Sequence, residues 1–151
     1  MAQILIVAHT PLASSLQAVA QHVYPDCGQQ LMAVDVAPGA SLETVEARLR
    51  AAMAAPPLAG CEVLILADVF GATPCNAALA AADGVRSRVV AGVNVPMLWR
   101  TLCYAGLSLE DLVSRAVAGA TQGVMHVSVP RRQNQLTTTA SHDQVQHHHQ
   151  Q

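Results

Sequence analysis

The segment Gln3-Ile-Leu-Ile-Val-Ala-His-Thr-Pro11 decides the fold of this chain. Residues 4–8 form a continuous apolar run of strand length, which is typical of a parallel strand buried on both faces. Apolar residues then recur at helical spacing over 12–23, and Pro11 suits the first turn of such a helix. A buried strand that leads straight into a helix predicts an α/β domain with an open, doubly wound sheet.

The alternation of strand and helix continues along the chain and then breaks. Strands are predicted over 30–36, 62–67 and 87–91, and helices over 42–53, 73–82, 95–104 and 109–120. No strand separates the last two helices, because only the turn Ala105-Gly106 lies between them. The last apolar segment, Val124–Val129, is therefore expected to run antiparallel at the edge of the sheet, where it could also pair with a neighbouring subunit.

Composition predicts one domain followed by a tail. Of the 151 residues, 52% are apolar and only 12% are charged, so part of the surface is expected to be apolar and to favour an oligomer or a docking face. Residues 1–129 are predicted to form the domain, and 130–151 a polar tail with too few apolar residues to order itself. The histidines 147–149 in this tail could bind a metal adventitiously, but an incidental low-complexity end is the simpler interpretation, and no metal site is predicted.

Charge and cysteine usage exclude several classes of protein. The net charge is −2 and no basic cluster is present, which argues against nucleic-acid binding. All eight cationic residues are arginines, so a catalytic lysine is excluded. The four cysteines include no Cys-x-x-Cys pair and are interpreted as small buried thiols. Because no long apolar segment or signal peptide is present, we expect a cytoplasmic protein without membrane insertion.

Two polar residues stand at strand-to-helix junctions. His9 follows the first predicted strand, and Asp68 follows the strand 62–67. Open α/β sheets carry their chemistry at this edge, and the start of the next helix favours an anion. A histidine here is as often structural as catalytic, and an aspartate is often only a turn or cap residue. Together, however, they suggest a nucleophilic or phosphoryl-accepting imidazole whose tautomer a carboxylate fixes.

Three further residues at these junctions could contribute to a site. Gly71 would allow the backbone to approach a ligand closely, and Thr73 could donate its hydroxyl and amide to an anion at the start of a helix. Asn94 either lines the site or only caps the helix that follows it.

Three ordered motifs resemble the mannose-type IIA domain of the bacterial phosphoenolpyruvate-dependent sugar phosphotransferase system. They are His9 after the first strand, Asp68-Val-Phe-Gly-Ala-Thr-Pro-Cys-Asn-Ala-Ala78, and Gly92-Val-Asn-Val-Pro-Met-Leu98. The resemblance covers about residues 1–129. It implies the strand order 2-1-3-4 and a homodimer in which the antiparallel edge strand is exchanged between subunits.

The same resemblance assigns roles to individual residues. It implies that His9 accepts a phosphoryl group on Nε2 from the phosphocarrier HPr, and that Asp68 binds the opposite ring nitrogen. Backbone amides around Thr73, with Gly71 and Ala72 among them, would hold the phosphate. Thr10 stands where the family often has glycine, so Thr10 either contacts the phosphate or only caps the first helix.

The destination of the phosphoryl group stays open at this point. No IIB domain follows in this sequence, so the expected acceptor is a separate IIB-type protein, and no cofactor is required. The alternative is a regulatory module whose phosphorylation state controls binding to a partner protein. A phosphotransfer subunit of dihydroxyacetone kinase ranks lower, because such subunits usually carry further fused domains that this sequence lacks. A hydrolase that uses His9 and Asp68 also ranks lower, because no serine or cysteine stands in a nucleophile-elbow motif.

Overall fold

A computed structural model describes residues 1–28 and 31–130 of the chain. This part contains four strands and five helices, and each has the type that the sequence predicts, with ends within two residues of the predicted ones. In chain order they are β1 (Gln3–His9), α1 (Leu12–Val23), β2 (Leu31–Val36), α2 (Leu42–Ala54), β3 (Val63–Ala67), α3 (Thr73–Ala81), β4 (Ser87–Ala91), α4 (Val95–Cys103) and α5 (Leu109–Gln122).

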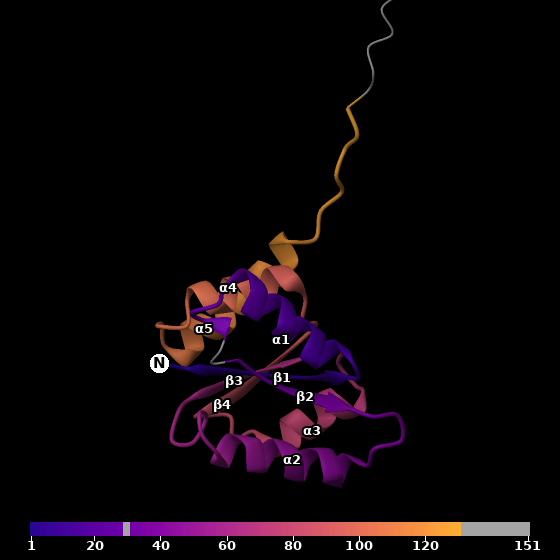
Figure 1. Cartoon of the computed structure of the whole chain (residues 1–151), viewed down its shortest axis with the longest axis vertical. Coiled ribbons are helices and arrows are strands. Elements are labelled where there is room, and N and C mark those ends of the chain that lie inside the picture. Colours follow the sequence, from indigo (N-terminus) through magenta and orange to yellow (C-terminus); the bar gives the residue numbers. More distant parts are fainter. Residues whose placement is uncertain (29–30, 131–151) are drawn as a thin grey trace, which may run out of the picture.

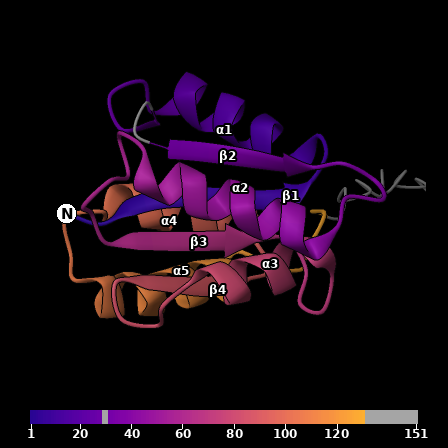
Figure 2. The ribbon, with the colours of Figure 1, turned by 90° about the horizontal axis from the view of Figure 1, so that it is seen from below.

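The four strands form one parallel sheet in the order β2-β1-β3-β4, which confirms the predicted α/β fold and strand order. Helices α1, α4 and α5 cover one face of the sheet, and α2 and α3 cover the other (Figure 1). Viewed from the side of α2, the strands run side by side and their arrowheads point to the same edge (Figure 2). The carboxyl ends of all four strands therefore meet at one edge of the domain.

Side-chain alternation along β1 divides the core into two layers. Ile4 and Ile6 pack with α1, α4 and α5, whereas Leu5 and Val7 pack with α2 and α3, and all four side chains are buried. Burying both faces of a strand explains the continuous apolar run in its sequence. The same alternation carries residue 9 to the face that holds Leu5 and Val7, which is the α2–α3 face.

Helices α4 and α5 pack closely because glycine replaces a side chain at their contact. A Cβ atom built on Gly119 would lie 2.7 Å from the Cβ of Arg100, and one on Gly123 would overlap the ring of Pro96. These two glycines allow α5 to return along α4 without an intervening strand.

The structure of a single chain does not show the strand that the sequence predicts over Val124–Val129. These residues form no strand in the structure, and they run away from the sheet beyond α5 (Figure 1). Val124, Val127 and Val129 are 76%, 75% and 87% exposed. An extended segment becomes a strand only by hydrogen bonding to a neighbouring strand, and here none lies beside it. Exchange between two chains stays a prediction, and the predicted tail lies outside the described residues from 131 onward.

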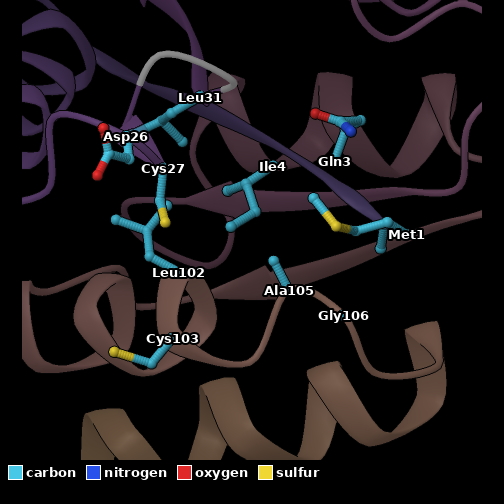
Figure 3. A pocket seen from close by; sticks show the side chains of 11 residues that line it. Met1, Gln3, Ile4, Asp26, Cys27, Leu31, Leu102, Cys103, Ala105 and Gly106 are labelled. Atoms are coloured by element: carbon cyan, nitrogen blue, oxygen red, sulfur yellow. The ribbon is translucent and has the colours of Figure 1, made fainter.

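The interpretation of the cysteines as buried thiols is also only partly correct. Cys75 is buried in the core, but Cys27 and Cys103 are exposed. Both of these thiols line a pocket of about 200 Å³ at the amino end of the sheet, with Ile4 and Leu31 (Figure 3). None of the predicted site residues lines this pocket, so the candidate site lies at the opposite edge.

A single carboxylate organises the turn that leads into β4. Oδ1 of Asp83 accepts hydrogen bonds from the amides of Val85, Arg86 and Ser87 at 2.8–2.9 Å, and from the Ser87 hydroxyl at 3.0 Å. These hydrogen bonds, led by that of the Ser87 amide, lower the pKa of Asp83 from 3.8 to about 2.

The substitution Asp83→Asn is expected to lower the melting temperature at neutral pH. Because the folded-state pKa is depressed, the stabilisation by Asp83 is complete above pH 4 and is lost as the pH falls through 2. Thermal unfolding followed by circular dichroism between pH 2 and 7 should therefore give curves for wild type and variant that converge at the acidic end. Curves that stay parallel over this range would contradict the role given to Asp83.

Candidate functional site

His9 and Asp68 stand at the carboxyl ends of neighbouring strands. His9 is the last residue of β1, and Asp68 follows the last residue of β3. The register pairs Val7 of β1 with Ala67 of β3, so Asp68 stands level with Ala8, and His9 stands one position further along β1. The structure thus brings together two side chains that lie 59 positions apart in the sequence.

The His9 ring and the Asp68 carboxylate form a short hydrogen bond. Nδ1 of His9 lies 2.6 Å from Oδ2 of Asp68, and the His9 amide donates to the same oxygen at 2.9 Å. The amide of Val69 donates to the other carboxylate oxygen, Oδ1, at 2.8 Å. These donors fix the carboxylate, whose side chain is only 10% exposed, whereas the imidazole is 53% exposed.

The local environment keeps Asp68 ionised. Burial alone would raise its pKa, but hydrogen bonds from the amide and ring of His9 and from the Val69 amide outweigh it, so the net pKa lies below 3.8. An ionised carboxylate has no proton to donate, so the neutral His9 ring carries its hydrogen on Nδ1 and donates it to Asp68. Nε2 then holds a free lone pair on the exposed part of the ring, and within residues 1–28 and 31–130 it has no hydrogen-bond partner.

The N-terminus of α3 comes five residues after Asp68 in the chain and has no side-chain cap. Its N-cap residue is Ala72, which forms no capping hydrogen bond, whereas Ser41 and Ser108 cap α2 and α5. Gly71 precedes it with a φ of +88°, a left-handed conformation that favours glycine. The open amides and the dipole of this helix end favour an anion there.

Two of the predicted site residues form hydrogen bonds that hold the fold together. The side chain of Asn94 caps α4 by accepting from the Met97 amide at 2.9 Å, and it donates to the Ala120 carbonyl at 3.3 Å. The capping alternative for Asn94 is therefore present in the structure. Thr10 does not cap α1, because the N-cap residue is Pro11; the Thr10 amide instead donates to the Val36 carbonyl at 3.1 Å.

One carboxylate at this edge is absent from the residues that the sequence patterns single out. Oδ1 of Asp35, near the end of β2, accepts a hydrogen bond from the Ser14 amide in the first turn of α1 at 3.1 Å. A charged residue within the otherwise apolar strand 31–36 is the signal that could have identified it.

Residues 1–28 and 31–130 show neither a metal centre nor a membrane span. Within them, no group of three His, Cys, Asp or Glu side chains is placed to hold a metal ion. No helix in these ranges is both long enough and apolar enough to span a bilayer. The histidines 147–149 lie outside the described residues.

Sequence comparison connects the chain to known proteins. The profile of the EIIA-man family, described as the fructose IIA component of the phosphotransferase system, matches residues 3–117. The fructose-specific EIIA component of Bacillus subtilis is 36% identical over 94 residues, which cover 61% of this chain and 64% of that protein. The mannose-specific EIIAB component of Escherichia coli is also 36% identical over 94 residues, but the match covers only 29% of that protein.

Solved structures share the fold at lower identity. The mannose/sorbose-specific IIA subunit from Enterococcus faecalis has a TM-score of 0.77 and 23% identity over 87% of this chain and 98% of that chain. The EIIA component from Streptococcus agalactiae has a TM-score of 0.73 and 21% identity, covering 83% of this chain and 97% of that chain.

Replacement of Asp68 by alanine is expected to release the tautomer of the His9 ring. Without the carboxylate, Nδ1 loses the acceptor that favours its protonated form, and the neutral imidazole shifts toward the more common Nε2–H tautomer. Nitrogen-15 NMR of the imidazole at a pH where the ring is neutral measures this change directly. His22 of the same chain provides an internal reference, and an unchanged His9 spectrum in Asp68→Ala would rule out control of the tautomer by Asp68.

Proposed function

This chain belongs to the EIIA-man family of phosphotransferase-system components, and from that premise we propose that it is a phosphoryl carrier that uses His9 as acceptor. The observation that carries the proposal is the 2.6 Å hydrogen bond between His9 Nδ1 and Asp68, which leaves Nε2 as the nucleophile. Family membership supports a role in phosphotransfer; the acceptor residue, the donor and the onward acceptor are our proposals.

The proposed reaction moves a phosphoryl group between two imidazoles. The lone pair on Nε2 of His9 attacks the phosphorus of a phosphohistidine on the donor protein, and a new N–P bond forms. The donor's N–P bond breaks, and its electron pair returns to the donor imidazole. In the onward transfer, a nucleophile of the acceptor protein attacks the phosphorus, the Nε2–P bond breaks, and its electron pair returns to the His9 ring. His9 is thereby regenerated without any cofactor.

Asp68 and the N-terminus of α3 would stabilise different parts of the phosphorylated form. As Nε2 becomes bonded to phosphorus, the ring gains positive charge, which the ionised Asp68 stabilises through Nδ1–H. The phosphoryl oxygens carry negative charge, and we propose that the amides of Gly71, Ala72 and Thr73 at the open end of α3 bind them. Thr10, exposed directly after His9, is proposed as an additional contact to the phosphate.

The exposure of the site suits protein partners. The His9 side chain is 53% exposed, which makes it accessible to a second protein that brings its own phosphoryl group. We propose phospho-HPr as donor and a separate IIB-type protein as acceptor, in the cytoplasm. The chain covers 64% of the Bacillus subtilis relative and 29% of the Escherichia coli one, and we assign no sugar to it.

Incubation with phosphoenolpyruvate, enzyme I and HPr is expected to add one acid-labile phosphate to the protein. Intact-mass measurement should show the added phosphate in wild type and in the control variant His22→Ala, and no addition in His9→Ala. Asp68→Ala should accept the group about 10²-fold more slowly or worse, because it lacks the charge that stabilises the forming imidazolium. Wild type that gains no phosphate, or His9→Ala that retains it, would refute the proposal.

We further propose that the chain forms a homodimer through residues 124–129. Three exposed valines lie in this segment. Strand β4 is one of the two edge strands of the sheet, so its outer edge is unpaired within residues 1–28 and 31–130. An exposed apolar segment and an open strand edge are complementary, and pairing two chains would bury both.

The substitution Val127→Asp should shift this dimer to monomer at micromolar concentration, because it places a charge in the exchanged strand. Sedimentation velocity measures the change, and Val23→Asp, which alters an exposed valine at the end of α1, should remain dimeric. Monomeric wild type at high concentration, or a Val127→Asp variant that dimerises as wild type does, would refute the exchange.

A further inference from the structure

We propose that Asp35 is a positioning residue for the phosphoryl group. Its carboxylate occupies the N-terminus of α1, so that the phosphoryl group binds at the N-terminus of α3 instead. This inference rests on the function proposed above, since it concerns the orientation of the phosphoryl group on His9.

Two helices begin at the edge of the sheet where His9 stands. The N-cap residues Pro11 of α1 and Ala72 of α3 both lack a side-chain cap. Neither helix carries an acidic residue in its first turn. Each helix end could therefore attract an anion through its free amides and its dipole. His9 is joined to α1 by two residues, so α1 is the nearer of the two along the chain.

Asp35 makes these two helix ends different. Its Oδ1 accepts from the Ser14 amide at 3.1 Å, and Ser14 is the third residue of α1. This amide is one that the helix itself leaves unpaired. The carboxylate thus occupies the position that an incoming anion would take, and its charge already offsets the positive end of the α1 dipole.

The alternation of side chains along the strands places Asp35 and His9 on opposite faces of the sheet. Val34 and Val36, which flank Asp35, pack in the core beneath α2 and α3, so the side chain between them leaves the sheet on the α1 face. His9 continues the row of Leu5 and Val7 and lies on the α2–α3 face. A phosphoryl group on His9 therefore lies on the face of α3, while Asp35 closes the helix end on the other face.

The backbone around Asp35 is held from two sides. The Asp35 carbonyl accepts from Nη1 of Arg48 in α2 at 2.9 Å, and the Val36 carbonyl accepts from the Thr10 amide at 3.1 Å. Arg48 thus binds the main-chain carbonyl of Asp35, and the carboxylate accepts from the Ser14 amide of α1. The two main-chain hydrogen bonds hold the backbone from which the Asp35 side chain extends.

A titration with inorganic phosphate tests the inference on the unphosphorylated protein. In two-dimensional amide NMR spectra of wild type, the signals of Gly71 and Thr73 should shift with phosphate and that of Ser14 should not. In Asp35→Ala the Ser14 signal should shift as well, because its amide becomes free. The control Glu110→Ala, which removes an acidic residue from the first turn of α5, should behave as wild type.

Phosphorylation of His9 provides a second measurement that a purely structural cap would not affect. Asp35→Asn keeps an acceptor oxygen for Ser14 but removes the charge, so the α1 dipole is no longer offset. The transfer equilibrium with phospho-HPr should shift about two- to fivefold toward the phosphorylated chain, with the melting temperature as a separate check on folding. Glu110→Gln is the matched control and should leave the equilibrium unchanged.

Several results would overturn the role of Asp35. These are a Ser14 signal that shifts in wild type as far as that of Thr73, a Ser14 signal that stays fixed in Asp35→Ala, or an unchanged transfer equilibrium in Asp35→Asn. If Asp35→Ala does not fold, the equilibrium of Asp35→Asn decides alone. A wild-type chain that never gains phosphate from HPr would refute the proposed function, whereas the titration with inorganic phosphate would still test Asp35.

Discussion

The parallel pairing of β1 with β3 is the constraint on which the candidate site depends. Parallel strands end at the same edge, so the register that pairs Val7 with Ala67 also places the residues after them side by side. The 2.6 Å contact between the His9 ring and Asp68 is a direct consequence of this register. A shift by one residue would displace His9 along β3 by about 3.3 Å and break this contact.

The hydrogen bonds around this pair serve orientation more than stability. An ion pair with a half-exposed imidazole contributes little to folding, because water screens it. The same contact determines which ring nitrogen carries the hydrogen, and therefore which nitrogen can react. The Val69 amide and the His9 amide hold the carboxylate from the backbone, so the geometry does not depend on mobile side chains.

Helix ends provide the second level of organisation at this edge. The side chains of Ser41 and Asn94, each directly before its helix, cap α2 and α4, and Asp35 caps α1 from a neighbouring strand. Helix α3 has no such cap, and it begins five residues after Asp68. The positive φ of Gly71 turns the chain into this helix without a side chain in the way.

The order and type of every element up to α5 follow from the amino-acid sequence alone, because apolar periodicity and cap residues are local properties. It also identified His9 and Asp68 as candidates, since both stand directly after strands. The contacts that join distant segments depend on the tertiary structure: the short bond from Nδ1 to Asp68, the cap that Asp35 places on α1, and the hydrogen bond from the Asn94 side chain to the Ala120 carbonyl. The apolar pattern of 124–129 predicted a strand, but a strand needs a neighbour, and within residues 1–28 and 31–130 none pairs with this segment. Local patterns fix which residues can pair, whereas register and packing fix which of them do.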